Sequence, residues 1–384
     1  MPIFVAYLII AIACTAITYK TYVGYGSYQW YTKALFLLFI VLGWSVPIVI
    51  FSLKNTTMDT FIIHATKGLY FLFGFVFLLF VLTFIRDFFW MIWDFIRKTP
   101  IEQIKNPPHL EKINIYTAIF TLLFCIYGVY EAEKIPSIKS FNIQSTKIKE
   151  NTKVVMLSDL HIDIDVSKEY VNKIVKKVNE LNPDIVVIAG DIVDSSPDKI
   201  LEQIKALSRI KATNGIYLSF GNHEVYNGEF DWLMTLGRLQ FNVFVNYGEK
   251  IGNTGIYLTG IPDINASAHG KIKVNVENAL YNSSNDDYVI VLSHTPKIAE
   301  GFTKDNVDLV LSGHTHGGQI FPFHFFTKQS NEGRLAGFYD INGIKMYVSR
   351  GTRYWGPPMR IGAPSEITVF NFSPKVNKNA TDNQ

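Results

Sequence analysis

Residues 153–161 read KVVMLSDLH, residues 184–191 read DIVVIAGD, and the stretch between them, residues 167–181, reads SKEYVNKIVKKVNEL. The two apolar runs predict buried strands at 153–158 and 184–189, because they are short, β-prone and bounded by polar residues. The intervening stretch has apolar residues at helical spacing, and Ser167 can serve as its N-cap. Strand, helix and strand in this order predict the start of an α/β domain.

The rest of the C-terminal part continues the alternation of helices and strands. Helices are expected at 197–211 and 231–239, strands at 215–219, 255–258, 288–292, 307–311 and 366–372, and a hairpin at 338–349 turning on Asn342-Gly343. Alternating units followed by a hairpin predict two packed sheets covered by helices. This domain is expected to span residues 151–373, with a disordered tail at 374–384 that is rich in Asn and Lys.

Five short segments with metal-coordinating residue types follow these predicted strands. They are Asp159-Leu160-His161, Gly190-Asp191, Gly221-Asn222-His223-Glu224, His294, and Gly313-His314-Thr315-His316. Because each segment comes after an apolar run, we expect the side chains to gather along one edge of a sheet. Five of the nine histidines of the chain lie in these segments, which makes a metal site the leading hypothesis.

The residue types and spacings fit a site for two metal ions. Asp159 and His161 are two residues apart on one loop, so both can bind the same ion. Asp191 is the natural carboxylate to bridge two ions. Asn222 offers a neutral amide oxygen, and the adjacent His223 is placed to face a substrate.

The remaining candidates are His294, His314 and His316, and alternate residues such as the last two project to the same side of an extended chain. Taken singly, each of these residues has an ordinary explanation as a turn residue or a hydrogen-bonded core histidine. Pairs of coordinating residues at strand ends are costly to desolvate without a partner, so the whole ordered set favours metal binding.

The ordered set resembles the calcineurin-like metallophosphoesterases over roughly residues 150–373. The resemblance implies a four-layer α/β/β/α sandwich that binds two divalent metal ions. It implies first-metal ligands Asp159, His161, Asp191 and His316, and second-metal ligands Asp191, Asn222, His294 and His314. It also implies that His223 contacts the phosphate and protonates the leaving group, and that Glu224 orients His223.

The implied reaction is hydrolysis of a phosphoester, with His223 and Asp191 as the catalytic residues. A water molecule activated by the two ions would attack phosphorus directly. The mixed Asp, Asn and His ligands favour Mn²⁺, with Fe, Zn²⁺ or Mg²⁺ as alternatives. Residues 317–319 and 349–362 further resemble the membrane-associated bacterial branch of the family, with Pro364-Ser365-Glu366 standing where Pro-Glu is expected.

The N-terminal third has a different character, since four apolar stretches at 3–18, 34–53, 69–85 and 113–130 are near the length that crosses a bilayer. A cleaved signal peptide is disfavoured, because no basic region precedes the first stretch and three more follow. We therefore expect a transmembrane domain at 1–130 and a polar linker at 131–150. Residues 87–98 carry aromatic and charged side chains that suit the membrane interface.

The membrane part narrows the expected substrate to a lipid-linked phosphate or pyrophosphate. The favoured substrate is UDP-2,3-diacylglucosamine, cleaved to UMP and a lipid monophosphate in lipid A synthesis. The alternative is an envelope phosphodiesterase or phosphatase that acts on another phospholipid or on cell-wall material. A protein phosphatase receives no specific support, and a transporter is disfavoured because the apolar stretches lack ionisable residues at their centres.

The expected location is the bacterial inner membrane, with the side of the catalytic domain left open. The loop 86–112 is rich in Lys and Arg and prefers the cytoplasm, which would put the catalytic domain outside, yet basic residues also follow the last stretch. A UDP-linked substrate requires a cytosolic domain. The net charge of +3 gives no indication of nucleic-acid binding, and no protein partner is implied.

Overall fold

The computed structural model describes all residues except 1, 25–27, 54–59, 106–108, 266–270 and 376–384. The chain forms two compact units. The helical unit comprises Met1–Tyr130 and Gly356–Met359, and the catalytic unit comprises Glu131–Trp355 and Arg360–Gln384. The expected tail at 374–384 lies almost wholly outside the described residues.

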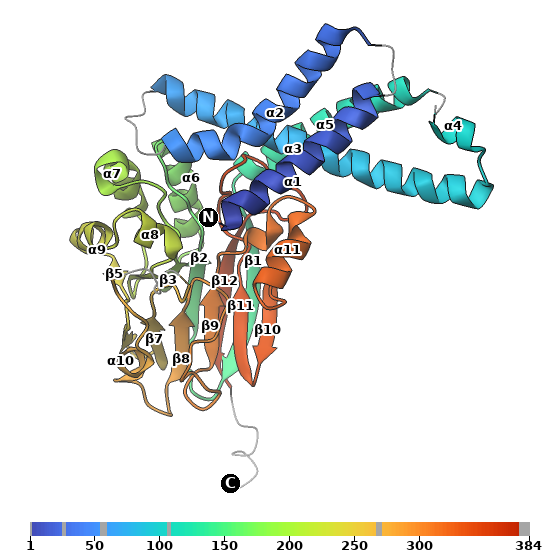
Figure 1. Ribbon diagram of the computed structural model, residues 1–384. Coiled ribbons are helices and arrows are strands. Elements are labelled where there is room, and N and C mark those ends of the chain that lie inside the picture. Colours follow the sequence, from blue (N-terminus) through green and yellow to red (C-terminus); the bar gives the residue numbers. More distant parts are fainter. Residues whose placement is uncertain (1, 25–27, 54–59, 106–108, 266–270, 376–384) are drawn as a thin grey trace. The chain divides into compact units, whose positions relative to one another are not determined.

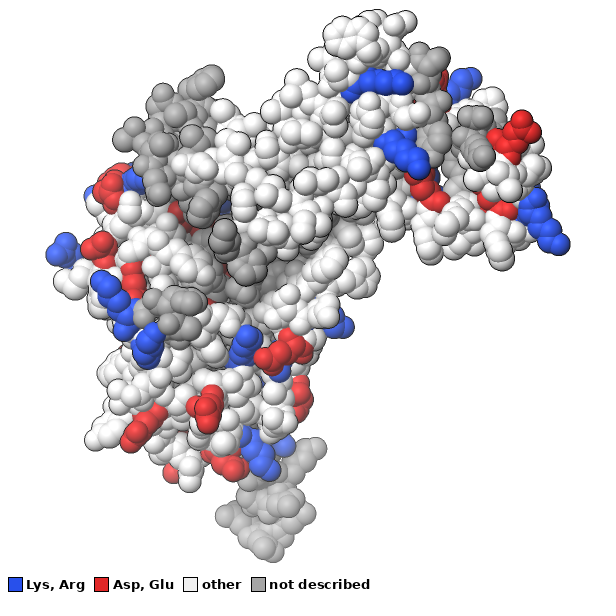
Figure 2. Space-filling model, viewed as in Figure 1, with Lys and Arg blue, Asp and Glu red and all other residues white. Residues whose placement is uncertain are grey.

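Among the described residues, four helices are long and apolar enough to cross a membrane. They are α1 (Pro2–Tyr19), α2 (Trp30–Leu53), α3 (Thr60–Arg97) and α5 (Leu110–Glu133). On the face shown in Figure 2, this unit has few charged side chains except toward the end that carries α4 (Ile101–Lys105). The protein is therefore a multi-pass membrane protein. The aromatic segment 87–98 continues α3 without a break as far as Arg97.

The catalytic unit contains two six-stranded sheets (Figure 1). The first has the order β1-β12-β2-β3-β4-β5 and the second the order β10-β11-β9-β8-β7-β6. The strands of the first sheet are β1 (Ser137–Ser145), β12 (Glu366–Pro374), β2 (Thr152–Leu157), β3 (Ile185–Ala189), β4 (Ile216–Ser219) and β5 (Asn242–Val243). Those of the second are β10 (Gly337–Ile341), β11 (Ile344–Val348), β9 (Leu309–Ser312), β8 (Tyr288–Leu292), β7 (Ile256–Gly260) and β6 (Tyr247–Lys250).

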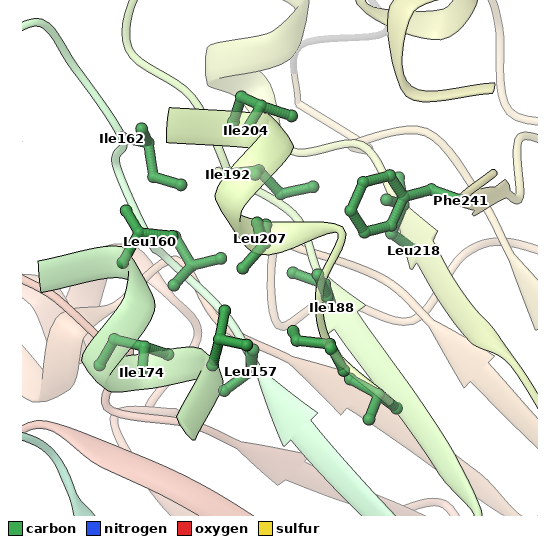
Figure 3. Close-up of a cluster of buried hydrophobic side chains, with 14 of the residues drawn as sticks. Leu157, Leu160, Ile162, Ile174, Ile188, Ile192, Ile204, Leu207, Leu218 and Phe241 are labelled. Atoms are coloured by element: carbon green, nitrogen blue, oxygen red, sulfur yellow. The ribbon is translucent and has the colours of Figure 1, made fainter. Parts of the chain in front are cut away.

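The central strands are buried on both faces, which explains their continuous apolar runs. In β2, Val155 and Leu157 face the helices that cover the first sheet, while Val154 and Met156 face the second sheet. The first of these cores is shown in Figure 3, where Leu157 and Ile188 from the sheet lie near Leu207. Side chains alternate along a strand, so one run of sequence supplies two cores.

Helices cover the outer faces of both sheets. The first sheet packs against α6 (Lys168–Asn179), α7 (Pro197–Leu207) and α9 (Glu229–Arg238). The second packs against the short helix α10 (Val276–Leu280) and neighbouring loops. The expected four-layer α/β/β/α sandwich is confirmed. The start of α6 is also as expected, since the Ser167 side chain accepts a hydrogen bond from the Tyr170 amide.

One expectation for the chain outside the core was wrong. Residues 137–145 were assigned to a linker at 131–150, but they form β1, which pairs in parallel with β12 at the edge of the first sheet. Most of the side chains of β1 are exposed, and the apolar alternation is confined to Phe141 and Ile143, which are partly buried against the core between the sheets. The chain after His316 contains a further short helix, α11 (Phe323–Ser330).

Candidate metal centre

The predicted site residues gather where parallel strands of both sheets end. Strands β2, β3 and β4 run parallel to one another, as do β7, β8, β9 and β11. Carboxyl ends of parallel strands meet at one edge of a sheet. Asp159 follows β2, Asp191 follows β3 and Asn222 follows β4, while His294 follows β8 and His314 follows β9.

Most of these residues have a left-handed backbone that is rare for residues other than glycine. Positive φ angles occur at Asp159 (52°), His161 (42°), Asp191 (52°), His314 (69°) and His316 (49°). Such conformations cost about 1–3 kcal/mol each and persist where the surroundings demand them. Their concentration in the loops at this edge is typical of a functional site.

The first cluster consists of Asp159, His161 and His316, all buried. The Nε2 atoms of the two imidazoles lie 3.0 Å apart, and His316 Nε2 is 3.6 Å from Asp159 Oδ1. Asp191 Oδ2 lies 3.8 Å from His161 Nε2, so Asp191 adjoins this cluster as well. The structure thus brings together all four of the ligands expected for the first metal.

The second cluster consists of Asp191, His294 and His314. Asp191 Oδ2 lies 3.0 Å from His294 Nε2, which in turn lies 3.3 Å from His314 Nδ1. Asn222 begins the short helix α8 (Asn222–Tyr226), directly after Gly221. Asp191 therefore lies between the two clusters, as a bridging carboxylate requires.

The hydrogen bonds of the imidazoles show that these clusters fit cations. His161 Nδ1 contacts Asp194 Oδ1 at 2.8 Å, His294 Nδ1 contacts the Ala189 carbonyl oxygen at 2.8 Å, and His316 Nδ1 contacts the Arg353 carbonyl oxygen at 3.1 Å. His161 Nδ1 and His294 Nδ1 face oxygens that only accept, so these two nitrogens donate, while His316 Nδ1 also lies 3.2 Å from the Arg360 guanidinium, which only donates. The Nε2 lone pairs of His161 and His294 are therefore left directed at another imidazole or at a carboxylate. This arrangement is repulsive without a positive charge and matches metal-bound histidine.

Two buried side-chain oxygens also indicate that the clusters fit cations. Asp159 Oδ2 and Asn222 Oδ1 are buried, and within the described chain neither has a hydrogen-bond partner. Buried polar atoms in folded proteins nearly always have a partner. Both atoms belong to expected ligand residues, so metal coordination would satisfy them.

Glycines allow the loops to approach this closely. A Cβ atom on Gly221 would lie 2.1 Å from Asp191 Oδ1, and one on Gly313 would lie 2.4 Å from Asp159 Oδ2. Neither position has room for a side chain. The amide groups that follow these glycines fix the carboxylates: His223 N donates to Asp191 Oδ1 (2.9 Å) and His314 N donates to Asp159 Oδ1 (2.8 Å).

The sequence analysis missed Asp194, which links the first cluster to His223. One oxygen of Asp194 contacts His161 Nδ1 at 2.8 Å and His223 Nδ1 at 2.5 Å. The opposite nitrogen of the second imidazole, His223 Nε2, lies 3.8 Å from Asp191 Oδ2 and faces the cluster. A signal was present in the sequence, because Asp194 lies only three residues after Asp191 on the same loop.

These contacts shift the pKa values of the groups involved. Burial by itself would lower the pKa of His223, but the negative charges of Asp191 and Asp194 outweigh it and raise that pKa to about 9. Burial would raise the pKa of the Asp194 carboxyl, yet the imidazoles of His161 and His223 hold it far below its usual range. The pair therefore favours a charged Asp194 beside a protonated His223, a state that nearby cations would oppose.

Glu224 does not orient His223 as expected. Its carboxylate accepts hydrogen bonds from four backbone amides instead, those of Gly221, Asp191, Ile192 and Val193, at 2.6–3.1 Å. These bonds tie the loop after β3 to the loop after β4. Glu224 therefore maintains the spacing of the loops, and Asp194 is the residue that contacts the ring of His223.

Two arginines behind the first cluster were also missed. The buried Arg360 guanidinium donates to four backbone carbonyls, including those of His316 (3.2 Å) and Arg353 (2.7 Å). Arg353 is also buried and donates to the His161 carbonyl (3.1 Å) and to Asp165 (3.2 Å). Together they fix the backbone of two of the three residues of the first cluster.

Aromatic side chains surround His223. The Trp355 ring lies edge-on to it with centroids 5.8 Å apart, and Tyr226 lies 5.9 Å away. These rings are 50% and 66% exposed, respectively, so they form part of the rim of the site as well as contacting the imidazole.

The comparisons with known proteins agree with this site. The profile of the calcineurin-like phosphoesterases matches residues 152–318. An uncharacterized metallophosphoesterase of Campylobacter jejuni is 33% identical over 299 residues, which cover 76% of this chain and 79% of that protein. A Helicobacter pylori relative, also an uncharacterized metallophosphoesterase, is 35% identical over 69% of this chain and 70% of its own.

Eukaryotes also have similar proteins. A transmembrane protein with a metallophosphoesterase domain from Danio rerio is 34% identical over 66% of this chain and 61% of that protein. Among solved structures, a dimetal phosphatase from Danio rerio matches with a TM-score of 0.36 and 13% identity, over 54% of this chain and 90% of that chain.

The chain belongs to the calcineurin-like metallophosphoesterase family. It is a membrane-spanning member, and the enzyme class is that of a dimetal phosphoesterase.

Proposed function

We propose that this enzyme hydrolyses a lipid-linked phosphoester or pyrophosphate at the edge where Asp191 lies between two clusters of imidazoles. The observation that carries the proposal is the convergence of Nε2 lone pairs and carboxylate oxygens at 3.0–3.8 Å. The proposed first-metal ligands are Asp159, His161, Asp191 and His316. The proposed second-metal ligands are Asp191, Asn222, His294 and His314.

Two divalent ions bound there would bind phosphate oxygens and lower the pKa of a water molecule that attacks phosphorus. The role of the protein is to position the reacting groups and to supply a proton. His223 donates that proton from Nε2 to the leaving oxygen, because its Nδ1 is already in contact with Asp194. Asp194 orients the imidazole and stabilises its protonated form.

The membrane-spanning helices and the apolar rim of the site support a lipid substrate. Trp355 and Tyr226 provide exposed aromatic surface beside His223, and Phe230 and Met234 are further exposed apolar side chains on α9. An apolar rim suits acyl chains better than a phosphopeptide. The specific substrate that we propose is UDP-2,3-diacylglucosamine, cleaved at its pyrophosphate, with Mn²⁺ as the preferred ion.

The direct test uses purified full-length protein with UDP-2,3-diacylglucosamine and either Mn²⁺ or Mg²⁺. Release of UMP together with the lipid monophosphate is the expected result. Intact substrate, in a preparation that still hydrolyses a simple phosphodiester, would reject this substrate while keeping the enzyme class. A phosphopeptide offered in parallel tests the protein-phosphatase alternative.

Membrane sidedness separates the nucleotide-linked substrate from an envelope substrate. We place the protein in a bacterial inner membrane, because four of its described helices are long and apolar enough to cross a bilayer and two of its relatives are bacterial. A compartment-sensitive reporter fused after Gln384 would show the side of the catalytic unit. A cytosolic signal is expected for the UDP-linked substrate, whereas an external signal favours an envelope phosphodiesterase acting on another phospholipid or on cell-wall material.

A further inference from the structure

The helix α11 carries large apolar side chains that the catalytic unit leaves exposed. Phe325 is 67% exposed and Phe326 is 64% exposed, and no residue of this helix is buried. Burial of a phenylalanine side chain is favourable, because it removes a large apolar surface from water. Two such rings on one short helix indicate that an apolar partner covers them.

The two rings belong to a continuous surface. Phe321, 37% exposed, lies with its ring centroid 6.1 Å from that of Phe325. Phe323, 39% exposed, lies 6.5 Å from Phe326. We call these four phenylalanines the α11 aromatic patch.

The charges near the patch favour a lipid partner. Residues 317–331 contain no Asp or Glu, and Lys328 lies in the last turn of α11. Aromatic rings beside a positive charge are typical of segments that lie in the interface of an anionic bilayer.

Within the catalytic unit, contacts lead from the last residues of α5 to the patch. The last residues of α5, from Glu131 onward, belong to this unit, and Tyr354 OH donates a hydrogen bond to Glu133 Oε1 (2.9 Å). The next residue, Trp355, exchanges two hydrogen bonds with the Gln319 side chain, at 3.0 and 2.8 Å. Gln319 lies two residues before Phe321, so a short series of contacts joins the end of a membrane span to the start of the patch.

We propose that the α11 aromatic patch inserts into the headgroup region of the bilayer that the four helices cross. The patch is then a second membrane contact of the catalytic unit, independent of the spans. Interfacial elements of this kind reach about 5–10 Å into the boundary between headgroups and acyl chains. Since α11 begins seven residues after His316, this contact brings the opening of the metal site to the lipid surface. The inference extends the proposed function, because it concerns the partner surface and not the reaction.

Fluorescence quenching in reconstituted full-length protein tests the docking without any assay of activity. Phe325→Cys, in a background with Cys14→Ser and Cys125→Ser, is labelled with an environment-sensitive dye in phosphatidylcholine–phosphatidylglycerol vesicles. Tyr281→Cys is the matched control, since Tyr281 is 80% exposed at the end of α10. We expect headgroup-labelled lipid to quench the dye at 325 and not at 281. Equal quenching of both positions by a water-soluble quencher would overturn the proposal.

A second measurement uses the double variant Phe325→Asp/Phe326→Asp. Its turnover of a water-soluble phosphodiester should equal that of the wild type, and its turnover of vesicle-borne lipid substrate should fall at least about tenfold through loss of surface binding. Equal loss on both substrates would contradict docking. If the wild type hydrolyses no lipid at all, the proposed substrate class fails, and the quenching result still decides whether α11 docks.

Discussion

The two clusters at the sheet edge differ in how firmly the protein fixes their imidazoles. In the first cluster His161 and His316 are buried, and the Nδ1 atom of each contacts polar groups that the fold holds in place. In the second cluster His294 is fixed in the same way by the Ala189 carbonyl, but His314 is partly exposed. Across the described residues, the ring of His314 makes no hydrogen bond other than its contact with His294.

This difference predicts unequal affinity for the two metal ions. Removal of the group that fixes the non-ligating nitrogen of a histidine typically lowers metal affinity by about 10–100-fold. The first cluster has the additional support of the buried Arg353 and Arg360. We therefore expect the first ion to be held tightly and the second to exchange.

The largest effect is expected from Asp191→Ala, because it removes the carboxylate shared by both clusters. Both ions and all measurable turnover should be lost, as checked by elemental analysis and a phosphodiester assay. Asp198→Ala, at an exposed position on α7, is the control and should retain both. Retention of both ions in Asp191→Ala would show that this residue does not bridge.

His316→Ala and His314→Ala compare the clusters directly. We expect His314→Ala to keep about one ion per chain in the first cluster. His316→Ala should keep less than one, because the remaining cluster binds weakly. Elemental analysis after dialysis against a mild chelator gives the two occupancies, and equal values would contradict the proposed difference.

His223→Ala should leave both ions in place and lower turnover by about 10²–10⁴-fold, the usual contribution of a general acid. A substrate with a nitrophenolate leaving group should be affected less, since it needs no proton. Loss of metal in this variant would mean that His223 is a ligand and that the division of roles is wrong.

Asp194→Asn should have the smallest effect, confined to the first cluster and His223. The affinity of the first ion should fall about 10–100-fold. Negative charge at Asp194 raises the pKa of His223, so its removal lowers that pKa. Because the protonated form is the active acid, the alkaline fall in activity should move to lower pH. An unchanged pH profile would show that Asp194 does not influence proton transfer by His223.

The sequence alone indicated most of the catalytic fold and most of the candidate site. The apolar runs at 153–158 and 184–189 identify strands because burial on both faces leaves a continuous signature. The candidate ligands could be found because each one comes directly after such a run. The edge strand β1 left only a weak signature, since most of its side chains are exposed and its apolar alternation is limited to Phe141 and Ile143.

Only the tertiary structure decided which loops distant in sequence contact one another. Asp194 meets His223, and Arg360 reaches behind His316, because the strand order of the first sheet and the packing of the two sheets bring these loops to one edge. Local patterns determine where a strand ends, but not which other strand ends beside it. The sequence therefore determined the chemistry of the site, and the packing of the sheets determined which residues support each metal cluster and which aromatic side chains stay exposed.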